Sequence, residues 1–215
     1  MTNRAYIFDL DGTLLDTLPD LVRLTNMVLE ERGWPTRSSA EILSYVGDGG
    51  RMLLTRAAPS DTASDQIDEA FAVWQELYPT YGHALTKPYE DIPQTLSLLK
   101  QKGMRLGVLS NKFDAAAQSV ITEHFPGVFD IVRGECEDIP RKPDPRGLEY
   151  MMRQLDVLPE QTVYVGDSPS DIATAQAAGV VSVGVAWGYR SAADLEAAGA
   201  TRIATEPSEI IVDGD

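Results

Sequence analysis

The clearest pattern along the chain is a short apolar run that stops at two carboxylates. Residues 6–8 are hydrophobic and typical of strands, and Asp9-Leu10-Asp11-Gly12 follows directly. A continuous apolar run of this length indicates a strand buried on both faces of a parallel sheet. Such sheets bind ligands beyond the carboxyl ends of their strands, so Asp9 and Asp11 fall where a site is expected.

From Leu18 to about Gly82 the pattern is helical, with no strand between. Leu21, Leu24 and Val28 recur at helical spacing, and Gly33 ends that helix. Further helices are expected from Ser38 or Ser39 to Tyr45, over 51–58, and over a long segment carrying residues 67–78. We expect residues 15–85 to form an all-helical domain inserted into the rest of the chain.

Helices and strands then alternate to the end of the chain. The patterns predict strands at 105–109, 129–133, 162–165 and 180–185, a weak strand at 202–204, and helices at 92–102, 114–125, 145–155, 170–178 and 192–198. Alternation of this kind predicts a doubly wound, Rossmann-like parallel sheet of the α/β class. We assign residues 1–14 and 86–215 to this core, with Leu85–Tyr89 as a hinge and Val212–Asp215 as a disordered tail.

The composition narrows the classes of molecule that this protein is expected to bind. The 215 residues carry a formal net charge of −15, which disfavours binding to nucleic acid and to anionic membranes. The single cysteine, Cys136, cannot form an intrachain disulfide, which suits a reducing cytoplasm. No signal-peptide or transmembrane pattern is present. We therefore expect a cytoplasmic protein, monomeric or homodimeric, that acts on a small molecule.

Asp9 and Asp11 could simply form a surface turn, because Asp and Gly are ordinary turn residues. As residues two apart at a strand end, however, their carboxylates can face one way and repel each other. A cation between them relieves that repulsion, and Mg²⁺ prefers such oxygen ligands.

Polar residues also follow two later strands. Ser110-Asn111-Lys112 follows one of these strands, and Gly166-Asp167-Ser168-Pro169-Ser170-Asp171 follows the other. Lys142 lies between them in the segment Arg141-Lys142-Pro143-Asp144-Pro145, just before an expected helix. Each has an ordinary interpretation: Ser110-Asn111 could begin a turn with Asp114 as the next helix cap, Lys142 could be solvated, and Asp167 and Asp171 could be helix caps.

Together these groups supply what phosphomonoester hydrolysis needs. Asp9 can attack phosphorus as a nucleophile, and Asp11 can exchange protons with the leaving group and water. Mg²⁺ bridging Asp9, Asp167 and the phosphate would relieve the repulsion between their charges. Ser110 and Lys142 can bind phosphoryl oxygens.

Two further residues, Asp171 and Asn111, are expected to hold the reacting groups in position without touching the phosphate. Asp171 could hold Lys142 or a metal-bound water.

At this point the sequence resembles the haloacid dehalogenase superfamily of aspartate-nucleophile phosphatases. Four motifs match in order: Asp9-Leu10-Asp11-Gly12-Thr13, Ser110, Lys142, and Gly166 to Asp171. The resemblance implies that Asp9 is the nucleophile, that Asp11 is the acid/base and binds Mg²⁺ through its carbonyl, and that the insert is a helical cap. Superfamily dehalogenases lack the second aspartate, so Asp11 favours phosphoryl chemistry.

Within the superfamily the chain resembles phosphoglycolate phosphatases, through residues 11–21, Val46-Gly47-Asp48-Gly49 and Ser110-Asn111-Lys112. Phe113 and Asp144 depart from that subfamily's pattern. The best substrate is then 2-phosphoglycolate, with sugar phosphates or pyrophosphate as alternatives. A phosphoacceptor signalling module is a remote alternative, since such modules place their aspartate after a later strand and lack a large insert.

A carboxylate-bearing substrate needs a cationic partner. Arg51 follows the glycine-rich loop that contains Gly49, at the start of an expected helix, where a guanidinium could grip a carboxylate. The alternative is a surface arginine paired with Asp48.

Overall fold

The computed structural model describes residues 5–211, so the tail Val212–Asp215 lies outside the described part. The chain divides into two compact units, one formed by Met1–Asp16 and Pro88–Asp215 and the other by Thr17–Lys87. The dividing points lie two residues beyond those expected from the sequence.

The core unit contains a six-stranded parallel sheet in the order β5-β4-β1-β6-β7-β8. The strands are β1 (Ala5–Phe8), β4 (Arg105–Phe113), β5 (Ile131–Glu135), β6 (Thr162–Gly166), β7 (Val181–Val185) and β8 (Arg202–Ala204). The expected doubly wound α/β class is confirmed. Phe8 is in register with Val108 and with Val165, so β1, β4 and β6 end at the same edge.

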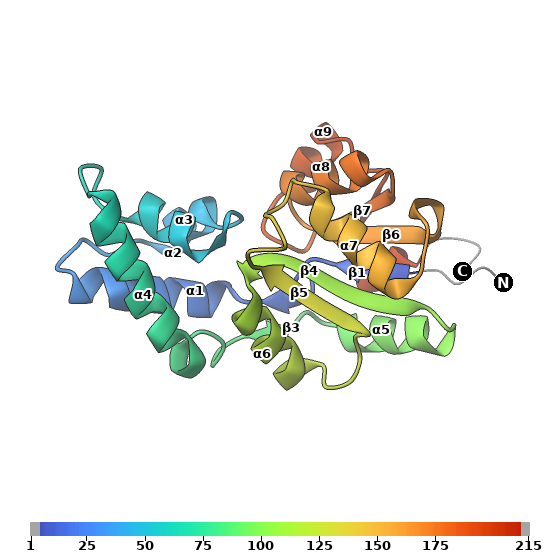
Figure 1. The fold of residues 1–215 in the computed structure, drawn as a ribbon, viewed down its shortest axis with the longest axis horizontal. Helices are drawn as coiled ribbons and strands as arrows, with labels where there is room; N and C mark the ends of the chain where they lie inside the picture. Colours follow the sequence, from blue (N-terminus) through green and yellow to red (C-terminus); the bar gives the residue numbers. More distant parts are fainter. Residues whose placement is uncertain (1–4, 212–215) are drawn as a thin grey trace. The chain divides into compact units, whose positions relative to one another are not determined.

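Both faces of the sheet are covered (Figure 1). The core helices are α5 (Ile92–Gln101), α6 (Asp114–His124), α7 (Arg146–Leu155), α8 (Pro169–Ala178) and α9 (Ala192–Ala197), with short 3₁₀ turns at Pro159–Gln161 and Pro207–Ile210. Side chains alternate along a strand, so Tyr6 and Phe8 pack with α5 and α6. Ile7 packs on the other face with α7 and α8. This double burial explains the continuous apolar pattern of β1.

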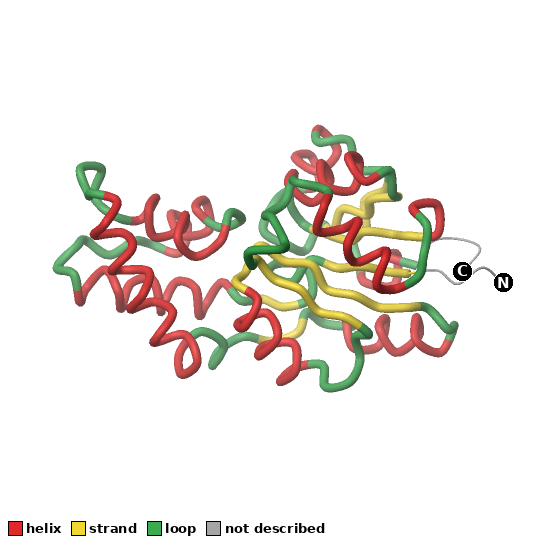
Figure 2. The backbone as a smooth tube through the Cα atoms, in the orientation of Figure 1, coloured by secondary structure: helices red, strands yellow, loops and turns green. Residues whose placement is uncertain are grey.

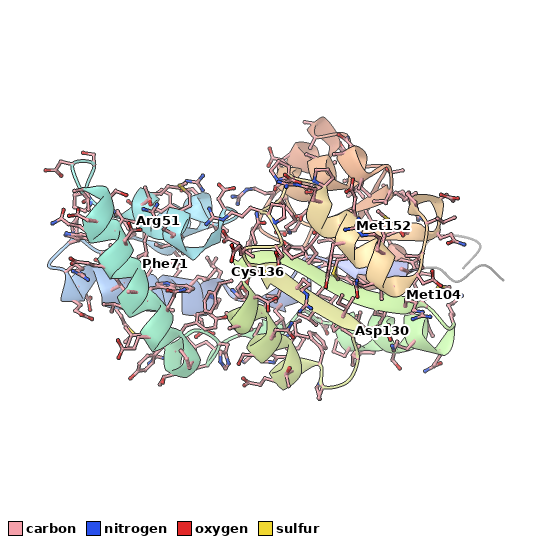
Figure 3. All side chains as sticks on the ribbon, in the orientation of Figure 1. Arg51, Phe71, Met104, Asp130, Cys136 and Met152 are labelled. Carbon is pink, nitrogen blue, oxygen red and sulfur yellow. The ribbon has the colours of Figure 1, made fainter. Side chains whose placement is uncertain are left out.

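The insert unit is helical, as α1 (Leu18–Glu31), α2 (Ser39–Tyr45), α3 (Gly49–Ala57) and α4 (Ser64–Tyr81). Ser38 caps α2 through a reciprocal bond pattern with Glu41. Trp74 is buried and lies 6.1 Å, between ring centroids, from Phe71, which Figure 3 labels on α4. A Cβ on Gly50 would lie 3.0 Å from the Phe71 ring, so α3 and α4 pack closely.

Several element boundaries differ from those expected. Two strands of two residues each, β2 (Leu15–Asp16) and β3 (Lys87–Pro88), pair with each other where we expected only a hinge. They are too short to show a periodic pattern. The strand expected at 129–133 begins at Ile131 and ends at Glu135 instead, and Phe129 before it packs edge-on against Phe8, with ring centroids 6.2 Å apart. Among residues 5–211, no helix is both long and apolar enough to cross a membrane.

Candidate active site

Strands β4, β1 and β6 are neighbours in the sheet, whose strands are yellow in Figure 2. The predicted site residues of the core lie within β4 or in the segments that follow β1, β5 and β6. Asp9 follows β1, and Asp167 follows β6. Ser110 was expected after its strand but lies within β4, which continues through a register shift to Phe113. Ser110 is buried, and its Oγ accepts a hydrogen bond from the Lys112 backbone N–H at 3.2 Å.

Lys142 is buried between two carboxylates. Its Nζ lies 2.8 Å from Oδ1 of Asp9 and 2.6 Å from Oδ1 of Asp171. Burial lowers the pKa of Lys142, but the nearby Asp171 and Asp9 carboxylates outweigh it and raise that pKa well above its usual value. Asn111 fixes the lysine's backbone, accepting from its N–H at 2.8 Å and donating to its carbonyl at 3.3 Å. A charged ammonium is thus held at Asp9.

Asp171 has donors on both of its oxygens. Besides Lys142, Oδ1 accepts from the Tyr164 hydroxyl at 3.2 Å. Oδ2 accepts from the Ser168 hydroxyl at 2.6 Å and from its backbone N–H at 3.0 Å. Ser168 and Asp171 form the capping box that begins α8. Asp171 therefore takes part in the cap of α8 and also holds Lys142. The sequence suggested these two roles as alternatives, and the structure shows both contacts.

Asp9 is buried, and its Oδ1 is paired with the Lys142 ammonium at 2.8 Å. Burial, the largest effect, raises the pKa of Asp9 to about 7, with Lys142 opposing the shift and Asp171 and Asp11 adding to it. A carboxylate can accept about four hydrogen bonds, so Asp9 keeps acceptor capacity for a ligand beside this ion pair.

Asp167 is held by Thr13, which the sequence placed in a motif without a role, and by Tyr189, which it did not single out. Its Oδ1 accepts from the Thr13 hydroxyl at 3.2 Å and its Oδ2 from the Tyr189 N–H at 2.7 Å. A Cβ on Gly188 would lie 2.3 Å from the Asp167 Cβ, so only glycine allows this approach. Burial first, then Asp9 and Asp171, raise the pKa of Asp167 well above its usual value. The segment after β7 shows no pattern that would identify it.

The acidic groups could hold a metal ion. Oxygen atoms of Asp9, Asp167 and Asp171 all lie within 4.8 Å of one another. Asp171 already receives an ammonium and two hydroxyls, so Asp9 and Asp167 are the better pair of carboxylate ligands. The donor set is entirely oxygen, which suits a hard divalent cation.

Asp11 is held by Lys112. The Lys112 Nζ lies 2.9 Å from Oδ1 and 3.0 Å from Oδ2 of Asp11, and the lysine side chain is 3% exposed. The sequence placed Lys112 in a motif but gave it no role. The sheet register could have indicated the contact, because Phe8 aligns with Val108 and the segments after these two residues continue past the same edge of the sheet.

The two insert residues proposed from the sequence lie together on α3, which begins at Gly49 rather than at Arg51. Arg51, labelled in Figure 3, donates to Asp68 at 2.6 Å and to the Ser64 hydroxyl at 3.0 Å. The alternative pairing of Arg51 with Asp48 is wrong, because Asp48 binds Arg56 instead. Whether Arg51 contacts substrate stays a prediction.

Comparisons with known proteins agree with this geometry. The haloacid dehalogenase-like hydrolase family matches residues 6–185. A phosphoglycolate phosphatase of Pseudomonas putida is 33% identical over 90% of this chain and 73% of its own length. One of Vibrio cholerae is 35% identical over 85% of this chain and 84% of its own.

A comparison with solved structures agrees with these sequence comparisons. The crystal structure of a predicted phosphoglycolate phosphatase from Haemophilus somnus has a TM-score of 0.90 and 27% identity, covering 98% of this chain and 97% of that one. An α/β core, a carboxylate-lysine cluster at its strand ends and matches across most of the sequence converge: the chain belongs to the haloacid dehalogenase-like hydrolases and is an enzyme similar to their phosphatases.

Proposed function

We propose that this enzyme is a Mg²⁺-dependent phosphomonoester hydrolase that works through an aspartyl-phosphate, with 2-phosphoglycolate as its best substrate. The observation that carries the proposal is Asp9, a buried carboxylate 2.8 Å from the Lys142 ammonium and with an oxygen within 4.8 Å of one of Asp167. Names of similar proteins support the choice of phosphoglycolate.

In the first half-reaction, an Asp9 oxygen attacks phosphorus and the bond from phosphorus to the leaving oxygen breaks. Asp11 gives its proton to that oxygen, and the alcohol departs. In the second half-reaction, Asp11 takes a proton from water, and the resulting hydroxide attacks the phosphorus of the aspartyl-phosphate. Inorganic phosphate leaves, and the Asp9 carboxylate is restored.

Ser110 and Lys142 are assigned to the phosphoryl oxygens, the first as a hydroxyl donor and the second as a fixed positive charge. Asp9 and Asp167, with the backbone of Asp11, would hold the Mg²⁺ ion. When bound, this ion supplies positive charge against the phosphate and the two carboxylates. Asn111 and Asp171 keep Lys142 in place.

The experiment is phosphate release from a panel of esters, with Mg²⁺ and after chelation. The panel contains 2-phosphoglycolate, sugar phosphates, pyrophosphate and 4-nitrophenyl phosphate. Repeated Mg²⁺-dependent turnover with phosphoglycolate preferred supports the proposal. Preference for a sugar phosphate or pyrophosphate would retain the mechanism and change the substrate. A single phosphorylation without turnover would point to the phosphoacceptor alternative, and full activity after chelation would exclude the metal.

A further inference from the structure

Lys112 is a second buried lysine at the strand ends, and the chemistry proposed above does not use it. Its side chain is 3% exposed, about as buried as that of Lys142 at 4%. The two lysines serve different carboxylates, since Lys142 lies on Asp9 and Asp171 while Lys112 lies on Asp11. The nucleophile and the acid/base each have an ammonium of their own.

The main chains around this pair are fixed independently of it. After β1 the chain turns back on itself, with the Gly12 N–H donating to the Leu15 carbonyl at 2.9 Å and the Leu14 N–H to the Leu10 carbonyl at 3.0 Å. On β4, the Lys112 N–H donates to Ser110 Oγ at 3.2 Å. These bonds fix the main chain but do not set the orientation of the Asp11 carboxylate plane.

Lys112 restrains that plane. Its Nζ lies almost equally far from the two carboxylate oxygens, at 2.9 and 3.0 Å, so rotation of the carboxylate breaks at least one contact. Lys112 is buried while Asp11 is 16% exposed, so at least the ammonium is desolvated, and burying a charge is seldom the cheapest way to stabilise a fold. A functional use therefore accounts for the pair better than stability does.

We propose that Lys112 is a positioning residue that holds Asp11 in the orientation for proton exchange with the leaving group and with water. This inference rests on the proposed function, in which Asp11 is the acid/base. Proton transfer depends steeply on geometry, and a misplacement of about 1 Å can cost about 100-fold in rate. The Lys112 ammonium also stabilises the carboxylate that forms when Asp11 gives up its proton.

The test uses three esters that differ in the leaving group. The alcohols leaving 2-phosphoglycolate and 2-hydroxyethyl phosphate both need a proton, but only the first carries a carboxylate. 4-Nitrophenyl phosphate releases a stable anion that needs no proton. For Lys112→Met we expect kcat/KM to fall about 30- to 300-fold on both alkyl esters and less than about fivefold on the aryl ester. Lys112→Arg should recover most of the loss.

Lys100→Met is the matched control, because it removes an exposed lysine that binds Asp130 at 3.1 Å in the same unit. It should change none of the three values. Lys112→Gln replaces Lys112→Met if the latter does not fold, as judged by circular dichroism and melting temperature.

Three outcomes for Lys112→Met would overturn the inference. Equal losses on all three esters, or no loss, would mean that the lysine has only a structural role or none. A loss confined to 2-phosphoglycolate would mean that Lys112 binds the substrate carboxylate instead. Two other results would contradict the proposed function itself. The first is a wild type that releases phosphate from none of the esters, and the second is an Asp11→Asn variant whose loss of kcat/KM is the same for all three esters.

Discussion

Asp171 in the core and Asp20 in the insert are both fully buried carboxylates, but different donors satisfy them. Asp171 receives the Lys142 ammonium, whereas Asp20 receives the Leu85 N–H at 2.8 Å and the Thr86 hydroxyl at 2.8 Å. Asp20 ties the first turn of α1 to the segment that leaves the insert, which is a structural task. Asp171 fixes a charge next to Asp9. In this pair, the charged partner of Asp171 lies at the site, whereas the neutral donors of Asp20 hold the insert together.

The largest effect is expected from Asp9→Asn, which removes the nucleophile and leaves the shape. Turnover of 2-phosphoglycolate should fall by at least about 10⁴-fold, because an amide cannot form the acyl phosphate. The melting temperature without metal should not fall, since the substitution removes a buried carboxylate whose pKa burial raises. Steady-state kinetics and thermal unfolding measure both, and retention of a tenth of the wild-type kcat would contradict the assignment.

The next effect compares the two buried acids directly. Asp171→Ala should lower the free energy of unfolding by about 3–5 kcal/mol, because it leaves the Lys142 ammonium with a buried partner missing. Asp20→Ala is the matched variant and should cost about 2–3 kcal/mol, because it strands two neutral donors. Denaturant unfolding at neutral pH gives both values. Equal costs would mean that charge pairing adds nothing to the burial of Asp171.

A smaller effect, of opposite sign, is expected from Asp167→Asn without metal. Burial and the Asp9 carboxylate raise the pKa of Asp167, so the aspartate destabilises the fold increasingly as pH rises above its ordinary value of 3.8. The amide can still accept from Tyr189 and donate to Thr13. We expect a melting temperature about 2–4 °C above wild type at pH 8 and a smaller gain at pH 5. Added Mg²⁺ should stabilise the wild type only, and a lower melting temperature at pH 8 would contradict this account.

The smallest effect is expected at Arg51. Its partner Asp68 is exposed, and exposed ion pairs contribute little, so Arg51→Ala should shift the melting temperature by less than about 2 °C. The same variant sharpens the question of substrate. A loss of kcat/KM confined to 2-phosphoglycolate would support recognition by Arg51, and no loss on any ester would remove it from consideration.

Much of the core could be predicted because its signals are local. The apolar run before Asp9 and the alternation after Ile92 follow from burial on both faces of a parallel sheet. Topology then places Asp9 after β1 and Asp167 after β6, at neighbouring strand ends, whereas Ser110 lies inside β4. The helices of the insert were also recognisable from their spacing and from the cap at Ser38.

What could not be predicted depends on contacts distant in sequence. Asp114 looked like a helix cap, but its carboxylate accepts from the Gly134 N–H of β5 at 2.8 Å. The Tyr189 N–H reaches Asp167 from a loop without any motif. The use of Lys112 depends on the alignment of β4 with β1, which no residue pattern in either segment records.

The pairing of β2 with β3 has a consequence for how the chain is assembled. Paired strands lie about 4.8 Å apart, so the polypeptide leaves the core and returns to it at neighbouring points. The pairing holds the two ends of Thr17–Lys87 together, so the insert is a loop that is already closed. The entropy cost of closing a loop grows only slowly with its length. The insert can therefore be lengthened, shortened or exchanged at little cost to the sheet, which leaves it free to diverge while the strand ends stay as they are.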